Sequence, residues 1–258
     1  MLTDDLGAAV DLPDAPSRVV SLVPSLTEAI EVTAPGLLVG VTDYCTHPPD
    51  LVATRVGGSK YPNVDAVLDL APDLVVANGE ENRPVDVERI RAAGIPVWVT
   101  AAPATVPMAL DSLRTLVTAA LRLDPPSWLT AADDAWRHTE PVWATAIVPV
   151  WRKPWVVVGR DTFAGDVLLR LGVANAYAGH VDRYPRPPLT ELTGLIEAGT
   201  ADLVVLPDEP YEFTATDGPP DFPGASCVLV NGRLLTWYGP SLAAARAELA
   251  TALRPDRA

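Results

Sequence analysis

The chain has 258 residues, a formal net charge of −14 and 48% hydrophobic residues. The hydrophobic share can fill one large core or two lobes of about 120 residues each, and it argues against a disordered chain. The negative charge argues against binding to nucleic acid or to anionic lipid, because both need a basic surface. No apolar stretch reaches the length of a membrane-spanning helix, so membrane insertion is not expected either.

The start of the chain and its cysteines bear on the compartment. Residues 1–7 lack the positive charge and apolar core of a secretory signal, so a cytoplasmic location is expected. The alternative is a periplasmic or cell-surface protein whose leader has been removed. The two cysteines, Cys45 and Cys227, lie in opposite halves of the chain, and reduced thiols are expected.

A short apolar pattern occurs twice, half a chain length apart. Residues 73–76 and residues 202–205 both read Asp-Leu-Val-Val. An apolar run without alternation is typical of a parallel strand that is covered on both faces. Each copy follows a helix-like segment that opens with an acid, Asp65 or Glu191. The repeat predicts two similar α/β lobes with mostly parallel sheets and a ligand cleft between them.

The remaining pattern places elements along the first half of the chain. A capping box, Ser25 with Glu28, indicates the start of the first helix. Strands are expected at 18–23, 37–41, 74–77 and 95–100, and helices at 64–70, 86–93 and 105–121.

The second half contains the connector and the second lobe. A helix over 127–138 lies in a block without strands, which predicts a connecting backbone helix. The domain boundaries are therefore placed at 1–122, 123–141 and 142–258. Asn231 and Gly232 predict a hairpin turn between two strands. Further strands are expected at 146–150, 155–158 and 203–206, and helices at 161–171, from 191 and over 241–253.

Polar clusters follow the two repeated strands. Ligands of open parallel sheets bind just beyond the carboxyl ends of the strands. The first cluster, 78–83, contains Glu80 and Glu81, and the second begins with Asp208. These carboxylates are candidates for acid–base catalysis. However, the chain lacks a nucleophile elbow and the glycine-rich loops that hold phosphate, which disfavours both hydrolysis by a serine nucleophile and nucleotide binding.

Aromatic side chains gather near the same strand ends, where they would suit a large planar ligand. Arginines in the same regions could bind the carboxylate or phosphate groups of that ligand. The arginines are Arg83, Arg152, Arg160 and Arg183, and the aromatics are Tyr44, Tyr61, Trp151, Trp155, Phe163, Tyr184, Tyr211, Trp237 and Tyr238.

Cys45 and His47 are weak candidates for a metal ion site. Two ligands are too few for a closed site, so no bound metal ion is expected. His47 or Tyr44 is a better candidate for a contact to a larger metal chelate.

Several segments resemble a known family, the substrate-binding proteins of siderophore, haem and cobalamin ABC importers, in the helical-backbone metal receptor superfamily. The resemblance is closest to the cobalamin-binding branch, where residues 41–49, Val-Thr-Asp-Tyr-Cys-Thr-His-Pro-Pro, match a Tyr-x-x-Tyr-Pro-Pro segment. The other segments are 3–7, 18–28, 39–42, 72–76 and 94–97.

The resemblance implies a bilobal class III periplasmic-binding-protein fold and assigns roles to residues. Tyr44 matches a ligand contact, Ser59 or Lys60 stands where the cobalamin binder has a tryptophan, and His47 replaces the second tyrosine. Asp65 and Glu191 match the carboxylates that dock on the permease. The full set of expected ligand contacts is Tyr44, His47, Lys60, Tyr61, Glu81, Arg83, Trp151, Arg160, Tyr184, Asp208, Tyr211, Trp237 and Tyr238.

The sequence therefore predicts a non-enzymatic, monomeric binding protein without an intrinsic cofactor. Its ligand would be a metal chelate, a corrinoid such as cobalamin or a related tetrapyrrole such as haem first and a ferric siderophore second. The protein would serve ABC-type uptake or intracellular handling of the chelate. One alternative is a cytoplasmic enzyme on the same fold that acts through Glu80, Glu81, Asp208 or His47. A receptor for a free metal ion is the third interpretation.

Overall fold

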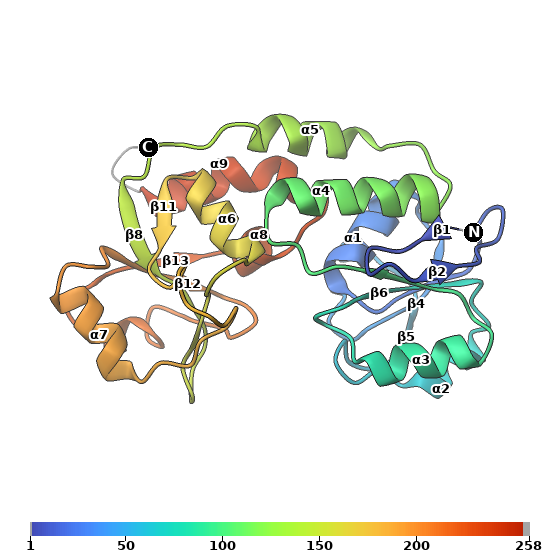
Figure 1. Cartoon of the computed structure of the whole chain (residues 1–258), viewed down its shortest axis with the longest axis horizontal. Helices are drawn as coiled ribbons and strands as arrows, with labels where there is room; N and C mark the ends of the chain where they lie inside the picture. The colour runs from blue at the N-terminus through green and yellow to red at the C-terminus, as the bar shows by residue number, and fades with distance from the viewer. Residues whose placement is uncertain (1, 255–258) are drawn as a thin grey trace. The chain divides into compact units, whose positions relative to one another are not determined.

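The computed structural model describes residues 2–254, which form two compact units (Figure 1). Unit 1 consists of the chain up to Ala102, Ala109–Thr130 and Tyr238–Pro240. Unit 2 consists of Pro103–Met108, Ala131–Trp237 and the chain from Ser241 on. The chain therefore passes between the units after Ala102, within helix α4 (Val106–Thr115), within helix α5 (Ser127–Trp136), and at both ends of Tyr238–Pro240.

Unit 1 is built on a five-stranded parallel sheet in the order β5-β4-β3-β6-β7. The repeated motif forms β6 at its interior, and all five residues of that strand are buried. A separate antiparallel pair, β1 with β2, precedes the sheet. The strands are β1 (Leu2–Thr3), β2 (Ala9–Val10), β3 (Val19–Ser21), β4 (Leu38–Val41), β5 (Thr54–Arg55), β6 (Leu74–Asn78) and β7 (Val97–Thr100).

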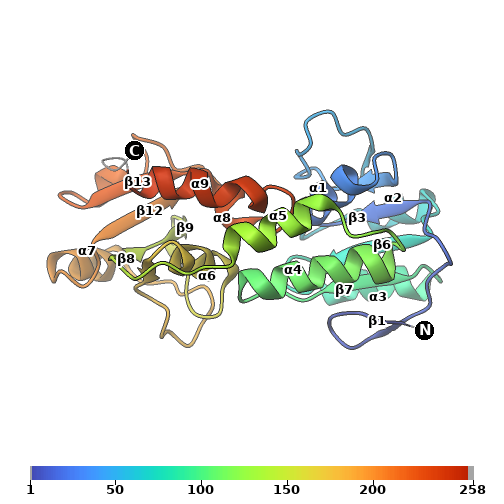
Figure 2. The same cartoon turned by 90° about the horizontal axis from the view of Figure 1, so that it is seen from above.

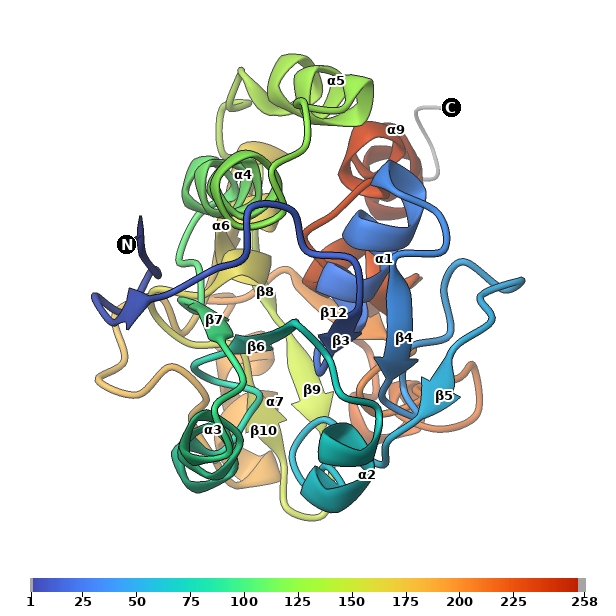
Figure 3. The same ribbon diagram turned by 90° about the vertical axis from the view of Figure 1, so that its right-hand side faces the viewer.

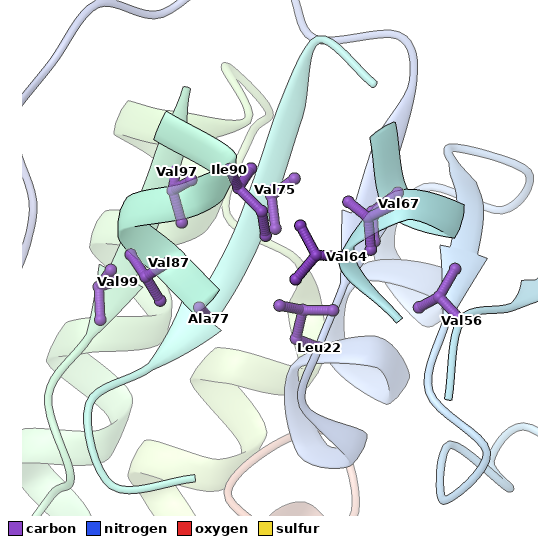
Figure 4. Packing of buried hydrophobic residues seen from close by; sticks show 11 residues of the cluster. Leu22, Val56, Val64, Val67, Val75, Ala77, Val87, Ile90, Val97 and Val99 are labelled. Carbon is purple, nitrogen blue, oxygen red and sulfur yellow. The ribbon is translucent and has the colours of Figure 1, made fainter. Parts of the chain in front are cut away.

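Helices cover both faces of this sheet, which explains the continuous apolar strands. Figure 3 shows α1 (Pro24–Thr33) and α4 on one face, with α2 (Val64–Asp69) and α3 (Pro84–Ala92) on the other. A π-helical stretch, Leu116–Ala120, continues α4. In Figure 4, Ile90 of α3 lies beside Val75 of β6, and Val67 of α2 belongs to the same cluster of buried side chains; Ile90 and Val67 are both fully buried.

Unit 2 repeats the layout with a four-stranded parallel sheet in the order β11-β8-β12-β13. Helix α9 lies against β13 (Figure 2), and helix α6 contacts β11. A short antiparallel hairpin, β9 with β10, extends from the end of β8. The elements are β8 (Ala144–Ile147), β9 (Pro149–Trp151), β10 (Val156–Val157), α6 (Phe163–Arg170), β11 (Val173–Asn175), α7 (Leu189–Glu197), β12 (Leu203–Pro207), a 3-10 turn (Pro219–Asp221), β13 (Ser226–Val230), α8 (Gly232–Thr236) and α9 (Leu242–Leu253).

The repeated aspartates accept hydrogen bonds from the backbone of a neighbouring strand's entry in both units. Asp73, before β6, accepts hydrogen bonds from the Ser17 N–H at 2.8 Å and the Arg18 N–H at 3.0 Å. Asp202, before β12, accepts one from the Thr145 N–H at 2.7 Å. Each carboxylate thus fixes the entry of the neighbouring parallel strand, β3 or β8. The prediction of two α/β units with parallel sheets is confirmed.

Two local predictions are wrong. Ser25 does not cap α1, because Pro24 already occupies the first helical turn and Val23 is the capping residue. Asn231 and Gly232 do not form a hairpin turn. Instead the Asn231 side chain accepts a hydrogen bond from the Leu234 N–H and caps the short helix α8.

Within residues 2–254, no helix is both long enough and apolar enough to span a membrane.

Candidate functional site

Asn78, the last residue of β6, organises the loop at the carboxyl edge of the unit 1 sheet. Its side-chain oxygen accepts hydrogen bonds from the Glu80 N–H at 2.9 Å and the Glu81 N–H at 3.3 Å. Its side-chain nitrogen donates to Thr100 Oγ1 at 3.1 Å and to the Tyr238 hydroxyl at 2.9 Å. Asn78 is 1% exposed, so this network is inside the fold and fixes the loop.

Asn82 closes the same loop from the other end. Its side-chain oxygen accepts from the Asn78 N–H at 2.7 Å. Its nitrogen donates to the Leu22 carbonyl at 3.2 Å and to the Ser59 carbonyl at 2.8 Å. The loop after β6 is therefore tied to the end of β3 and to the segment before α2.

Two acidic groups at this edge are electrostatically unusual. Burial, and then the neighbouring Glu80 carboxylate, raise the pKa of Glu81 to about 7. Burial, and then Glu81, raise the pKa of the Tyr238 hydroxyl well above its usual value. Glu81 therefore exchanges its proton near neutral pH, whereas Tyr238 stays neutral.

Exposed aromatic rings lie beside this loop. Tyr44 is 66% exposed and Tyr61 is 65% exposed. A Cβ atom added to Gly58 would lie 3.5 Å from the Tyr44 ring and 3.9 Å from the Tyr61 carbonyl, so the three residues are neighbours. The Arg83 guanidinium lies over the Tyr61 ring, 4.6 Å from its centroid. These rings give unit 1 an apolar contact surface of the kind a planar ligand needs.

Cys45 and His47, the weak metal candidates, do not form a ligand set. The Cys45 thiol is fully buried and lies 3.0 Å from Thr27 Oγ1 and 3.1 Å from Thr42 Oγ1. Burial raises the pKa of this thiol, which keeps it protonated and a poor metal ligand. His47 Nδ1 lies 3.0 Å from Thr46 Oγ1. In the part of the chain that the structure describes, no group of three His, Cys, Asp or Glu side chains could hold a metal ion.

In unit 2, Asp208 follows β12 and has a structural partner. One of its carboxylate oxygens accepts a hydrogen bond from the Gly232 N–H, at the start of α8, at 2.6 Å. Burial, and then Asp208, raise the pKa of the next residue, Glu209, and a hydrogen bond from Trp237 opposes that shift. Trp237 is 8% exposed and Tyr238 is 7% exposed, so this predicted contact pair is largely buried.

A cluster of aromatic rings covers the same edge of unit 2. Trp151 is 45% exposed and meets Tyr211 edge-on, with ring centroids 5.6 Å apart. The Tyr211 and Phe213 rings pack with their centroids 4.7 Å apart, and the Trp155 and Phe213 rings stack with their centroids 6.1 Å apart. Trp155 is 9% exposed and belongs to the core, whereas the Trp151 side chain is partly accessible to solvent.

The arginines near both edges already have carboxylate partners. Arg83 binds Asp86 through two hydrogen bonds, at 2.8 and 2.9 Å. Arg152 pairs with Asp217 and, at 2.9 Å, with Asp221. Sequence reasoning missed these aspartates, although the i,i+3 spacing of Arg83 and Asp86 is a signal that could have identified that pair. Arg160 pairs with Asp161 at 2.7 Å, and Arg183 donates a hydrogen bond to the Asp161 carbonyl. The last two predicted contacts are exposed: Tyr184 is 42% exposed, and Lys60 is also exposed.

Asp65 and Glu191, the predicted docking residues, occupy matching places in the two units. Asp65 lies in the first turn of α2, is exposed and pairs with Arg89. Glu191 lies in the first turn of α7, is exposed and accepts a hydrogen bond from the Tyr177 hydroxyl at 2.7 Å. Acids are also favoured there by the helix dipole, so their position alone does not require a partner.

The chain resembles binding proteins for vitamin B12 in sequence. No model of a known protein family matches it. The vitamin B12-binding protein of Vibrio cholerae is 32% identical over 88 residues, 33% of this chain and 32% of that protein. The chain thus spans about a third of the length of the curated relatives it matches.

Solved structures match over nearly the whole chain. The periplasmic vitamin B12-binding protein of Vibrio cholerae superposes with a TM-score of 0.73 at 18% identity, over 95% of this chain and 99% of that one. A periplasmic haem-binding protein in complex with two haems gives a TM-score of 0.78 at 22% identity, over 95% and 100%. At these identities, the likeness shows a shared fold.

These neighbours correct one prediction. A cytoplasmic location was expected from residues 1–7, but the proteins that share the fold are periplasmic, so that expectation is wrong. The expected resemblance is confirmed: the chain has the bilobal fold of periplasmic binding proteins for vitamin B12 and haem, and in sequence it is similar to a vitamin B12-binding protein.

Proposed function

We propose that this protein is a substrate-binding protein that captures a metal chelate for ABC-type uptake. The ligand class is a corrinoid or related tetrapyrrole first and a ferric siderophore second. The observation that carries the proposal is the coincidence of two features. The fold is that of binding proteins for vitamin B12 and haem, and exposed aromatic rings lie at the carboxyl edges of both sheets.

The proposed binding mode uses the exposed rings for area and the loops beneath them for rigidity. Tyr44 and Tyr61 in unit 1, and separately Trp151 in unit 2, are the exposed rings that would contribute apolar contact to the chelate. Trp237 and Tyr238, being largely buried, would shape the loops from behind. Because Asn78 fixes the unit 1 loop through its buried network, little ordering cost would remain for binding.

The enzymatic alternative has less support. Asp208, one of the candidate catalytic groups, accepts a hydrogen bond from the backbone N–H of Gly232 at the start of α8. The matched relative and the structural neighbours are named as binding proteins. Glu81, with its pKa near 7, is the group that would best serve as an acid or base. Turnover of a bound chelate by the wild type, lost in Glu81→Gln, would favour the enzyme.

Docking on a permease is proposed to use Asp65 and Glu191. They are exposed acids at matching helix starts, one in each unit. Asp65→Arg with Glu191→Arg should abolish transport of the chelate in a cell that depends on this protein, while the binding affinity of the purified protein stays unchanged. Unimpaired transport by the double variant would refute the docking role.

The test of the ligand class is a calorimetric titration of the purified protein with cyanocobalamin, haemin, ferrichrome and ferric enterobactin. A saturating one-to-one signal with any of these would support the receptor and name the class. No signal with all four, on protein with a cooperative thermal transition, would contradict it. Secretion of the natural protein from its source cells would test the extracytoplasmic location that we propose with it.

A further inference from the structure

The N-terminal hairpin, β1 with β2, carries a large apolar side chain in its turn. Leu6 lies in that turn and is 58% exposed. A single exposed leucine needs no explanation by itself, because much of any protein surface is apolar. The hydrogen bonds of the hairpin, however, hold this leucine in one place, at the edge of the sheet where the candidate site of unit 1 lies.

The turn of the hairpin is closed by hydrogen bonds of Asp4. Its Oδ1 atom accepts from the Leu6 N–H at 3.0 Å and from the Ala8 N–H at 2.9 Å. The Gly7 N–H donates to the Asp4 carbonyl at 3.0 Å. Gly7 has a φ of 85°, a left-handed conformation that glycine adopts without steric cost. The backbone that carries Leu6 is therefore fixed within its own turn.

Asp4 and Asp5 join the hairpin to β7, the strand at the end of the sheet order. The Val99 N–H donates to Asp4 Oδ2 at 3.3 Å. The Ala101 N–H donates to Asp5 Oδ2 at 3.2 Å. The Asp4 side chain is fully buried and also pairs with Arg91 at 3.1 Å. The hairpin thus satisfies backbone donors that an edge strand would otherwise expose, and in return it is held firmly against the sheet.

This attachment places Leu6 against the loop after β6. A Cβ atom added to Gly79 would lie 3.2 Å from Leu6 Cδ1 and 3.6 Å from Leu6 Cδ2. Gly79 is the first residue after β6, and its N–H donates to the Thr100 carbonyl, at the end of β7, at 2.9 Å. The next two residues of the loop are Glu80 and Glu81. Leu6 therefore lies at the carboxyl edge of the sheet, beside the loop of the candidate site.

The exposed rings of unit 1 lie on the other side of the same loop. Tyr44 follows β4 and Tyr61 follows β5, whereas the hairpin lies on the β7 side of the sheet (Figure 2). The ends of β4 and β7 are three strand spacings apart, about 14 Å, with loop 79–83 between them. All of these residues belong to unit 1. A flat ligand over the loop can therefore meet an aromatic ring on one side and Leu6 on the other.

We propose that Leu6 is a ligand contact of unit 1 and that Asp4 and Asp5 are positioning residues that hold it there. This inference rests on the proposed function and adds the N-terminal hairpin to its site. The part of the chelate that Leu6 recognises is apolar, such as methyl or methylene groups at the periphery. Because the hairpin is fixed before the ligand arrives, the contact carries little ordering cost.

The first test is a titration of Leu6→Ala with cyanocobalamin, haemin, ferrichrome and ferric enterobactin. A chelate that binds the wild type should bind the variant about fivefold more weakly, because apolar contact is lost. Leu169→Ala, at a leucine of α6 that is 41% exposed, is the matched control and should keep the wild-type affinity. Unchanged affinity in Leu6→Ala would overturn the inference and leave the proposed function intact. Failure of all four chelates to bind the folded wild type would overturn both.

A double-mutant cycle tests the positioning role of the hairpin. Asp5→Ala removes the acceptor of the Ala101 N–H and of the Ser112 hydroxyl. It should weaken binding of the chelate about threefold in the wild-type background and leave binding unchanged in the Leu6→Ala background. An equal loss in both backgrounds would overturn the positioning role, since Asp5 would then affect binding without Leu6.

Protection of a thiol reports the contact directly and does not depend on the size of the alanine effect. The probe is Leu6→Cys in a Cys227→Ser background, where Cys45 remains fully buried. Saturation with a chelate that binds the wild type should slow alkylation of the introduced thiol by iodoacetamide about fivefold or more, because the ligand covers it. Leu169→Cys in the same background should keep its rate. An unchanged rate at position 6 in the saturated protein would overturn the inference.

Discussion

The strands β6 and β12 begin alike and end differently. Both start with an aspartate that ties down the entry of the neighbouring strand. At the carboxyl end, β6 leads into a network of buried carboxamides around Asn78. The end of β12 leads instead into acids and an aromatic cluster around Tyr211. The repeated part of the motif therefore builds the sheet, and the divergent part carries the candidate site.

The largest expected difference concerns the buried amide of unit 1. Asn78→Ala should lower the free energy of unfolding by about 3 kcal/mol, because it leaves several buried donors and acceptors without partners. Asn231→Ala removes an exposed cap in unit 2 and should cost about 1 kcal/mol. Urea denaturation of both variants measures the difference, and equal losses would mean that the Asn78 network contributes little.

Glu81 should make the stability of the protein depend on pH. Its folded pKa of about 7 lies above its ordinary value of 4.5, so the folded state keeps a proton that the unfolded state loses between these pH values. Stability should therefore fall as pH rises from about 4.5 to 7, by up to about 3 kcal/mol, and the loss should be complete above 7. Glu81→Gln should remove this part of the profile. A variant whose stability profile parallels that of the wild type would refute the assignment.

The repeated aspartates allow a matched comparison between the units. Asp73 accepts three hydrogen bonds from Ser17 and Arg18, and Asp202 accepts one from Thr145. Asp73→Ala should cost about 2 kcal/mol and Asp202→Ala about 1 kcal/mol of unfolding free energy. Thermal unfolding of the two variants provides the measurement. A larger loss for Asp202→Ala would reverse the order that the hydrogen bonds imply.

The smallest effects are expected at the exposed rings, and they should appear in binding rather than in stability. Tyr61→Ala and Trp151→Ala should each weaken binding of the chelate about tenfold, since each removes apolar contact area. Their thermal transitions should move little, because both rings are exposed. Val52→Ala, at a side chain that is 92% exposed, is a suitable control. Affinities equal to the wild type in both ring variants would remove the proposed contact surface.

The strands of both units could be predicted, because their signal is local. In both copies Leu-Val-Val follows the aspartate as a short, β-branched apolar run, which is typical of a strand covered on both faces. The prediction of a hairpin turn at residues 231 and 232, where α8 begins, was wrong for a local reason too. Asn-Gly suits a hairpin turn, but the same asparagine can cap a helix, and the Asp208 carboxylate accepts from the Gly232 N–H at that helix start.

The candidate site was harder to predict because its contacts are distant in sequence. Asn78 meets Tyr238 across 160 positions, which no spacing rule could identify. The acid partners of Arg152, Asp217 and Asp221, lie more than 60 positions along the chain, so they depend on tertiary packing. Trp237 was expected to be an accessible contact, yet it is 8% exposed, so replacing it with alanine would disturb packing as well as binding.

The most direct test of the account is an absorbance and calorimetric titration of the wild type with cyanocobalamin, haemin, ferrichrome and ferric enterobactin, run beside Tyr61→Ala and Trp151→Ala. The account predicts one-to-one saturation by at least one chelate, unchanged on recovery, with weaker binding in both variants. Folded wild-type protein that binds none of the four, or that converts one of them to product, would contradict it.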